Sequence, residues 1–173
     1  MQSGNGIKFV DHGWGKILNN LKELSGTRVQ VGVLGSDGGR KHPDSDITVA
    51  EVALINEFGS GKAHIPSRPL LRGTFTKSNP MVQEIGRTIA SRVVNFMQSA
   101  SLALDAAGKV AVEALRVQIA KGVSPGNAPR TIKEKGFDHP LLWTGLLWEA
   151  LSHRVTGSGS FVADDYEPIS GGK

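Results

Sequence analysis

The sequence predicts an α+β fold, in which a small antiparallel sheet packs against long helices and extended loops connect the elements. Residues 28–34 alternate between apolar and polar side chains, which is the period of a half-buried strand. Residues 149–156 and 160–164 also alternate, and the Gly-Ser-Gly sequence between them is typical of a hairpin turn. Residues 80–121 instead carry apolar side chains at helical spacing. The first strand and the C-terminal hairpin are therefore expected to form the sheet, with the helices on one face.

A helix is expected before the first strand and a loop after it. Between residues 11 and 25, apolar side chains recur at spacings of three and four, and Gly26 is placed to end the helix. Residues 35–46, after the strand, are polar and rich in glycine. This composition predicts a loop.

A second helix is expected to begin at a capping box. Thr48 and Glu51 have the T-x-x-E spacing, in which each side chain satisfies a backbone donor at a helix start, and Gly59 is placed to end the helix. Its apolar residues, including Phe58, are expected to cover one side, while Glu51 and Glu57 stay in solvent.

The middle of the chain is expected to form a stiff corner, followed by a long helical region. Residues 65–69 contain two prolines, each of which restricts its own φ and the residue before it. The pattern over residues 80–121 fits either one very long helix or two helices joined near residues 99–101. Both alternatives place a helical layer beside the sheet.

The last helix expected from the sequence is short. Thr131 and Glu134 form a second capping-box pattern, and Gly136 is placed to end the helix that it starts. Residues 140–148, which follow, are compact and apolar. They lead directly into the C-terminal hairpin.

Composition favours one domain of ordinary globular type. The 173 residues suffice for a single core and are too few for two full domains. No stretch is long and apolar enough for a membrane-spanning helix, and the N-terminal residues lack the apolar region of a secretion signal, so we expect a cytoplasmic protein without a membrane partner. The chain contains no cysteine, which excludes disulfides and cysteine-bound metals.

No residue pattern indicates catalysis, a metal or a cofactor. The five histidines never occur at the i, i+3 or i, i+4 spacing of a helical metal site. The acidic pairs Asp44/Asp46 and Asp164/Asp165 lie in expected loops or hairpin ends, where carboxylates stay solvated. We therefore expect a protein that is not an enzyme.

Two glycine-rich loops carry basic residues. The segments 35–41 and 59–62 lack the spacing of a phosphate-binding loop, and they are interpreted as mobile loops. If they line a channel, Arg40, Lys41 and Lys62 are candidates to contact DNA phosphates without reading sequence. The net charge of +4 is compatible with such a neighbour, although the basic residues are scattered.

Three blocks of sequence resemble the tail-completion and neck proteins of tailed bacteriophages, a family that is similar to the virion morphogenesis proteins of Mu-like phages. The first block is residues 49–59, which end in Asn56-Glu57-Phe58-Gly59. The second is Ile65-Pro66-Ser67-Arg68-Pro69-Leu70-Leu71-Arg72. The third is Thr131-Ile132-Lys133-Glu134-Lys135-Gly136, followed by Pro140-Leu141-Leu142-Trp143-Thr144-Gly145-Leu146-Leu147. The loop 35–47 and the tail 165–173 lie outside the resemblance.

The resemblance implies a structural virion protein that completes the tail and joins it to the head. It implies a ring of six copies around the DNA channel, assembled in the host bacterial cytoplasm, with other neck or connector proteins and a tail-tube or tail-terminator protein as neighbours. The candidate interface residues lie in or beside the three blocks. They are Glu57, Phe58, Arg68, Pro69, Arg72, Trp143 and Trp148.

The arginine and tryptophan candidates each have a second interpretation inside the monomer. Arg68 and Arg72 can reach a neighbouring subunit, or they can pair with Glu51 or Glu57. The interface interpretation predicts that Arg68→Ala abolishes assembly and leaves the melting temperature nearly unchanged. Trp143 and Trp148 can anchor a partner, or they can pack in the core with the leucines around them.

A non-specific DNA-binding or packaging-accessory protein of a phage is the alternative function. Such a protein retards DNA as an isolated monomer, with strong salt dependence, whereas a joining protein binds its protein neighbours and contacts DNA little.

Overall fold

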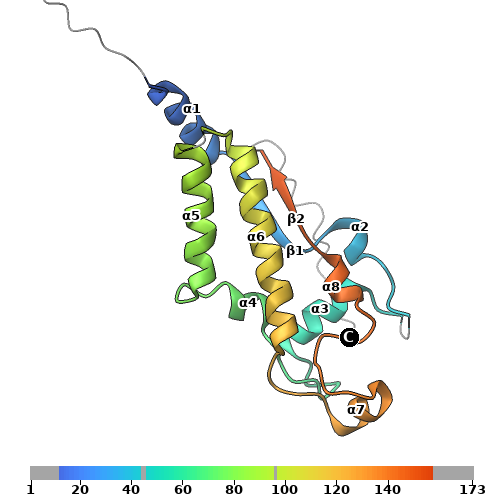
Figure 1. Ribbon diagram of the computed structural model, residues 1–173. Coiled ribbons are helices and arrows are strands. Elements are labelled where there is room, and N and C mark those ends of the chain that lie inside the picture. The colour runs from blue at the N-terminus through green and yellow to red at the C-terminus, as the bar shows by residue number, and fades with distance from the viewer. Residues whose placement is uncertain (1–11, 44–45, 96, 158–173) are drawn as a thin grey trace, which may run out of the picture.

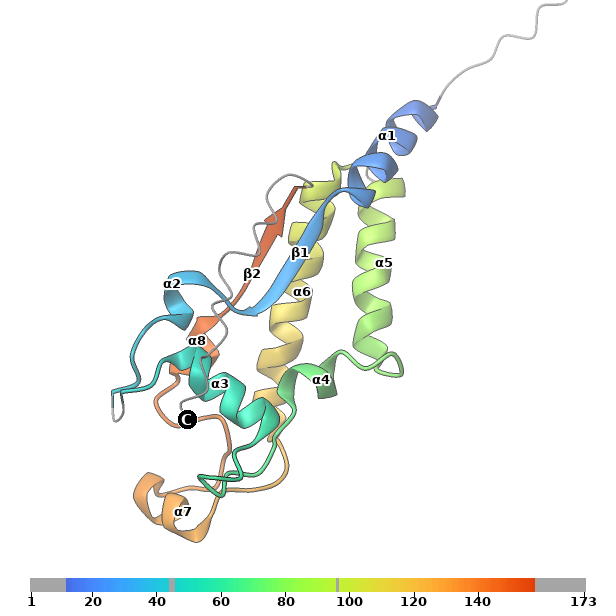
Figure 2. The same ribbon diagram turned by 180° about the vertical axis from the view of Figure 1, so that it is seen from behind.

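The computed structural model describes residues 12–43, 46–95 and 97–157 and has the expected α+β architecture. A long helix, α6 (Ala100–Lys121), runs through the middle of an elongated molecule (Figure 1). Helix α5 (Pro80–Val94) packs on one side of α6, and a two-stranded antiparallel sheet packs on the other (Figures 1 and 2). The fold therefore has three layers, and the longest helix is the middle one.

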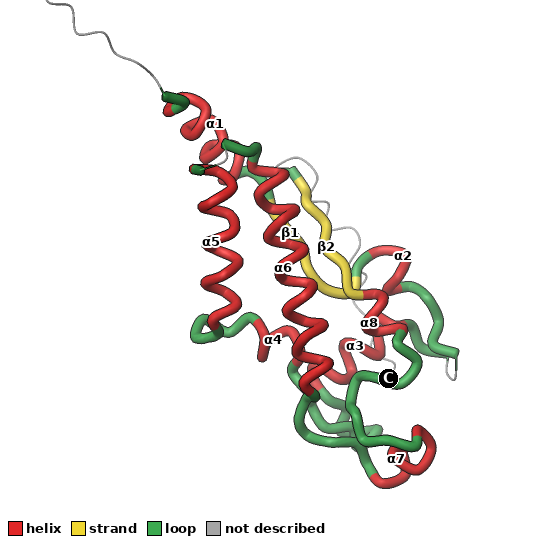
Figure 3. Tube along the Cα trace, viewed as in Figure 1, coloured by secondary structure: helices red, strands yellow, loops and turns green. Residues whose placement is uncertain are grey.

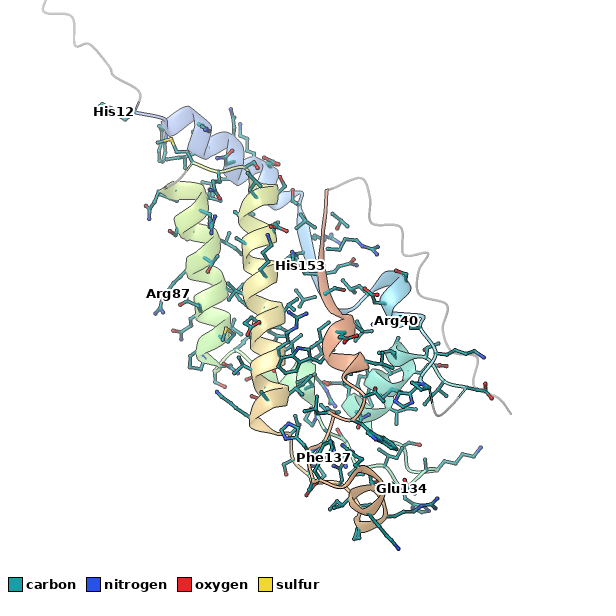
Figure 4. All side chains as sticks on the ribbon, turned by 45° about the vertical axis from the view of Figure 1, so that its right-hand side comes forward. His12, Arg40, Arg87, Glu134, Phe137 and His153 are labelled. Carbon is teal, nitrogen blue, oxygen red and sulfur yellow. The ribbon has the colours of Figure 1, made fainter. Side chains whose placement is uncertain are left out.

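Small residues allow α6 to occupy that central position. Half of its buried positions are alanine, and at Gly108 a Cβ atom would lie 2.3 Å from Cδ2 of His153. The imidazole of His153 therefore packs directly on the helix backbone, and its Nε2 lies 2.9 Å from Oδ1 of Asp105. Figure 4 shows His153 beside α6. This contact brings the sheet close to the helix.

The sheet pairs the first strand with the C-terminal one, as the sequence predicts. Strand β1 (Arg28–Val33) and strand β2 (Leu151–Thr156) are antiparallel, with Arg28 opposite Thr156 and Val33 opposite Leu151. Residues 149 and 150, expected in the second strand, belong instead to a short helix, α8 (Leu146–Ala150). The predicted third strand, residues 160–164, lies outside the described residues, as does the segment 165–173.

The helices at the start and in the middle of the chain agree with the apolar periodicity. Helix α1 (Trp14–Ser25) ends where Gly26 predicts. The pattern from residue 80 to residue 121 corresponds to two helices rather than one, because α5 ends at Val94 and α6 begins at Ala100. The amide Nδ2 of Asn20 on α1 donates to the carbonyl of Gln98 in this interruption, at 2.7 Å. The break therefore provides a polar contact for α1.

Two short helices lie in segments where the sequence patterns predicted no helix. Helix α2 (Gly35–Gly38) lies in the expected loop 35–46, and helix α4 (Leu70–Thr74) follows the proline corner. Neither has a capping side chain. Leu70 and Thr74 on α4 are buried, so packing rather than local sequence accounts for that helix.

The two capping-box predictions have opposite outcomes. Helix α3 (Val49–Phe58) begins at Thr48, and both reciprocal hydrogen bonds with Glu51 are present. Helix α7 (Pro129–Lys135) begins before Thr131, with Ala128 as the N-cap and Pro129 in the first turn, so the second prediction is wrong. Proline fixes φ near the helical value and needs no backbone donor, which favours a start at that residue.

On α3 the exposures of two neighbouring residues reverse the expectation from the sequence. Glu57 is 5% exposed and Phe58 is 61% exposed. The helix is apolar on more than one side, so its own sequence does not decide which side faces the core. The reason for the reversal lies in contacts from the next block of sequence, described below.

Two groups of buried apolar side chains form the core. The first joins α4, α6 and β2, and it contains Leu70, Leu115, Ile119 and Leu151. The second joins α3 and α8 through Val49, Leu147 and Ala150. Figure 3 shows that the loops gather at the end of the molecule that contains α3, α7 and α8. That end holds the residues that the sequence singles out for function.

Candidate functional site

The buried carboxylate of Glu57 connects the first of the three sequence blocks to the second. Its Oε2 accepts from the backbone N–H of Leu71 and its Oε1 from that of Arg72, each at 2.9 Å. The Arg72 side chain adds a bond from Nε to Oε1 at 3.1 Å. Burial alone would raise the pKa of Glu57, but the backbone N–H groups of Arg72 and Leu71 and the Arg72 guanidinium together hold the pKa below its usual 4.5. The start of α4 is therefore attached to a charged group.

The backbone of the first block also lies close to that of the second. The N–H of Arg68 donates to the carbonyl of Asn56 at 2.6 Å, and the hydroxyl of Ser67 donates to that of Glu57 at 2.8 Å. Gly59 has φ of 78°, and a Cβ atom at this position would lie 2.8 Å from the backbone N of Ser67. Glycine is therefore required at the turn that ends α3.

Arg68 joins both blocks to the loop that precedes α7. This side chain is 6% exposed. Its Nε donates to the carbonyl of Pro125 and its Nη2 to that of Gly126, each at 2.8 Å, while Nη1 lies 3.3 Å from Oδ1 of Asn56. Burial lowers the pKa of Arg68 below its usual range, and the charge of Asp138 opposes that effect. Arg68 therefore holds the loop by donating to carbonyls rather than by pairing with Glu51 or Glu57.

These segments surround a cleft of about 530 Å³. Helix α3 supplies Val49 and Val52, the proline corner supplies Ile65, and the segment before α8 supplies Leu141 and Leu146. The exposed ring of Trp143, 47% accessible, lies at this cleft with its centroid 6.4 Å from that of His42. A volume between about 300 and 1,000 Å³ is typical of sites that hold a ligand or a few side chains of a partner.

The polar groups of the cleft are mostly donors. Arg68, Lys135, His42 and His64 line it, and no aspartate or glutamate does among the residues that the structure describes. Burial lowers the pKa of Lys135, whose Nζ donates to the carbonyl of His139 at 2.7 Å. Asp138 is the nearby carboxylate that offsets part of this positive charge.

Asn127 adds a donor without an acceptor. Its Nδ2 atom is buried at the cleft and has no hydrogen-bond partner in the described part of the chain. The backbone N–H of the same residue donates to Oδ1 of Asp138 at 2.9 Å. A buried donor that lacks an acceptor costs free energy, so an anionic or carbonyl oxygen in the cleft is favoured next to it.

The predicted interface residues divide into exposed and buried groups. Phe58, Pro69, Arg72 and Trp143 are exposed, and the Arg72 guanidinium lies 4.7 Å above the ring of Phe58. Glu57 and Arg68 are buried in the contacts described above. Trp148 is half-buried and packs against the main core, in agreement with the core interpretation. We name the exposed pair Phe58 and Arg72 the 58/72 patch.

The three predicted DNA-contacting residues are all exposed. Arg40 lies 3.8 Å from Asp37 and 3.9 Å from Glu149, and Lys41 lies 3.4 Å from Asp46. Lys62 lies in the turn between Ser60 and Ile65. Figure 4 shows Arg40 near α2 and Glu134 and Phe137 near α7. Neighbouring carboxylates partly neutralise Arg40 and Lys41, and contact with DNA stays a prediction.

Within residues 12–43, 46–95 and 97–157, no cluster of three or more histidine, aspartate or glutamate side chains is arranged to hold a metal ion. Over the same residues, no helix combines the length and the apolar character that crossing a bilayer requires.

Sequence reasoning missed several residues of the cleft. Asn56, Asn127 and Lys135 have no motif that marks them, although Asn56 and Lys135 lie within the resembling blocks. The cleft forms between segments that are far apart in the chain. The resemblance of the blocks was the sequence signal that could have pointed to Asn56 and Lys135.

Comparisons with protein-family models, with curated proteins and with solved structures give no match for this chain. The relationship to phage neck proteins therefore stays a prediction from the three blocks of sequence.

Proposed function

We propose that this chain is a minor structural protein of a tailed-bacteriophage neck, which joins the tail to the head as a subunit of a ring around the DNA channel. The observation that carries the proposal is the meeting of the three resembling blocks at one end of the molecule. Glu57 in the first block bonds to the second, and all three line the cleft.

The outward face of this unit is suited to protein contact. Phe58 presents a large apolar ring with a guanidinium over it, and aromatic and arginine side chains are enriched at the centres of interfaces. Glu57 anchors Arg72 through Nε and leaves 56% of the arginine side chain exposed. Arg72 is therefore held in place before binding, which reduces the entropy lost when a partner docks.

A ring requires a heterologous contact, in which one surface of a copy meets a different surface of the next copy. The 58/72 patch supplies one of these surfaces in the proposed assembly. The number of six copies comes from the resemblance alone.

Electron microscopy of particles made when the gene is disrupted in its phage tests the proposal. Filled heads separated from tails are the expected result, and intact virions would contradict it. Complementation with Phe58→Asp should fail, while Leu102→Asp should restore virions. Leu102 is a matched control, because it is 58% exposed against 61% for Phe58 and lies on α6.

The DNA-binding alternative makes a different prediction for the same protein. If the isolated chain retards DNA with strong salt dependence and virions form without it, the alternative replaces the neck role. A joining protein should instead bind a connector or tail protein at a salt concentration that abolishes binding to DNA.

A further inference from the structure

The cleft has the chemistry of a docking site for a short acidic peptide with apolar side chains. Its walls are apolar, at Val49, Val52, Ile65 and Leu141, and the exposed ring of Trp143 extends them. Arg68 and Lys135 contribute two cations. A peptide that supplies carboxylates together with an aromatic or aliphatic side chain matches both properties.

Asn127 makes the preference for an anionic oxygen more specific. Its buried Nδ2 atom lacks an acceptor among the described residues, and it lies in the same cleft as Arg68 and Lys135. A carboxylate beside these three groups would satisfy the amide and oppose the two positive charges. Water can satisfy the amide, but it adds no negative charge to the part that Asp138 already offsets.

The chain contains one segment with this chemistry beyond its last described residue. Residues 165–169 read Asp165-Tyr166-Glu167-Pro168-Ile169, which place two carboxylates beside an aromatic and an aliphatic side chain. Pro168 lowers the entropy that the segment loses when it becomes ordered. The segment is therefore complementary to the cleft in charge and in apolar character.

The segment is long enough to reach the cleft of its own molecule. Strand β2 runs from Leu151, next to α8, to Thr156 at the opposite end of the sheet, a span of about 17 Å at the strand rise. Helix α8, which begins at the cleft residue Leu146, adds about 7 Å. Residues 158–165, if extended, span about 26 Å, which covers this return. A hairpin strand at residues 160–164, as the sequence predicts, would run in the required direction.

We propose that the cleft is the docking site of the chain's own segment 165–169. Asp165 and Glu167 face Arg68, Lys135 and Asn127, and Tyr166 and Ile169 pack on the apolar walls beside Trp143. The chain's own segment is preferred over that of a second copy because a short linker gives it an effective concentration of roughly millimolar. The docking does not depend on the neck role, since it takes place within an isolated chain.

Cysteine cross-linking on the full chain tests this proposal, because the chain has no cysteine of its own. Ser170→Cys is combined with Ala63→Cys or Ala128→Cys, two exposed positions that line the cleft. The control combines Ser170→Cys with Ser36→Cys, an exposed position on α2 outside the cleft. At least one cleft pair should form a disulfide within the chain about tenfold faster than the control pair.

Two results would overturn the proposal. Equal rates for the cleft and control pairs would show that the segment does not prefer the cleft. Disulfide-linked dimers on a non-reducing gel would show that the segment in the cleft belongs to a second copy of the chain.

Charge reversal identifies the contacts. Asp165→Lys with Glu167→Lys should remove the tenfold preference. Lys135→Glu should weaken the preference and Glu167→Lys should restore it in that background, which a simple loss of folding would not allow. A preference that survives charge reversal in the segment would contradict the proposed carboxylate contacts.

Discussion

The carboxylate of Glu57 and the side chain of Arg72 form a pair, 3.1 Å between Oε1 and Nε, in which the acid is almost fully buried and the base is largely exposed. The acid also accepts two backbone N–H groups from α4. These bonds offset the cost of burying the charge, and they place Phe58, the next residue, on the surface.

Glu57→Gln should lower the free energy of unfolding by about 2 kcal/mol, because the neutral amide weakens hydrogen bonds that are now made to a charge. Urea unfolding at pH 7 measures this change. Glu113→Gln is the control on an exposed part of α6, and it should change stability by less than about 0.5 kcal/mol.

The same substitution predicts a change in pH dependence. Because folding lowers the pKa of Glu57 from its usual 4.5, this carboxylate contributes stability above that value, and the contribution is lost as pH falls through the lower pKa of the folded state. The wild type should therefore lose more stability than Glu57→Gln between neutral pH and pH values below 4.5. Parallel curves for the two proteins would contradict the structure.

Arg68→Ala should lower the free energy of unfolding by about 3 kcal/mol, because it leaves the carbonyls of Pro125 and Gly126 without their donor inside the protein. Arg87→Ala on α5 is the control, and it should change stability by about 0.5 kcal/mol or less, because that arginine is exposed beside Glu84 (Figure 4). This expectation is opposite to the one that follows from placing Arg68 at a subunit interface. An unchanged melting temperature for Arg68→Ala would restore the interface assignment.

Gly108→Ala and Gly86→Ala should have effects of opposite sign, although both replace a glycine within a helix. At Gly108 a methyl group would lie 2.3 Å from the ring of His153, and the ring would have to move, which disturbs its hydrogen bond to Asp105. This overlap should lower the free energy of unfolding by about 1–3 kcal/mol, which exceeds the stability gained from the higher helix propensity of alanine. At Gly86 nothing lies within 4 Å, so the substitution should stabilise by about 1 kcal/mol. Thermal unfolding of both variants measures the difference, and two stabilised variants would contradict the close packing of β2 on α6.

Trp148→Ala and Trp143→Ala should separate core packing from surface contact. Trp148 packs against the main core, so its loss should cost about 3 kcal/mol of unfolding free energy. Trp143 is 47% exposed, and its loss should cost less than about 1 kcal/mol. Chemical unfolding checks both values, and similar losses for the two variants would show that Trp143 is part of the core.

Local patterns predicted the elements that depend on neighbouring residues. The alternation in residues 28–33 identified β1, and the spacing of apolar residues identified α1 and the helical region that contains α5 and α6. The capping box at Thr48 and Glu51 formed as predicted, because all of its groups lie within one turn. The same motif at Thr131 failed, because Pro129 starts α7 earlier than the threonine.

The candidate site was predicted only in part. The blocks that contain Glu57, Arg68 and Arg72 were singled out, but which of the three is buried could not be read from them. The donors to Glu57 lie 14 and 15 positions along the chain, and the acceptors of Arg68 lie 57 and 58 positions away. A local sequence pattern does not predict contacts between residues so far apart in the chain.

By itself, the sequence determined the fold class, the order of its main helices and strands, and the lack of any cysteine chemistry. These properties depend on composition and on periods of two and 3.6 residues, which a linear pattern contains. Only the tertiary structure decided that Glu57 is inside, that Phe58 is outside, and that a cleft with cations and apolar walls lies between α3, α7 and α8. The physical reason is that burial of a charge is decided by the donors that meet it, and here those donors come from distant segments of the chain.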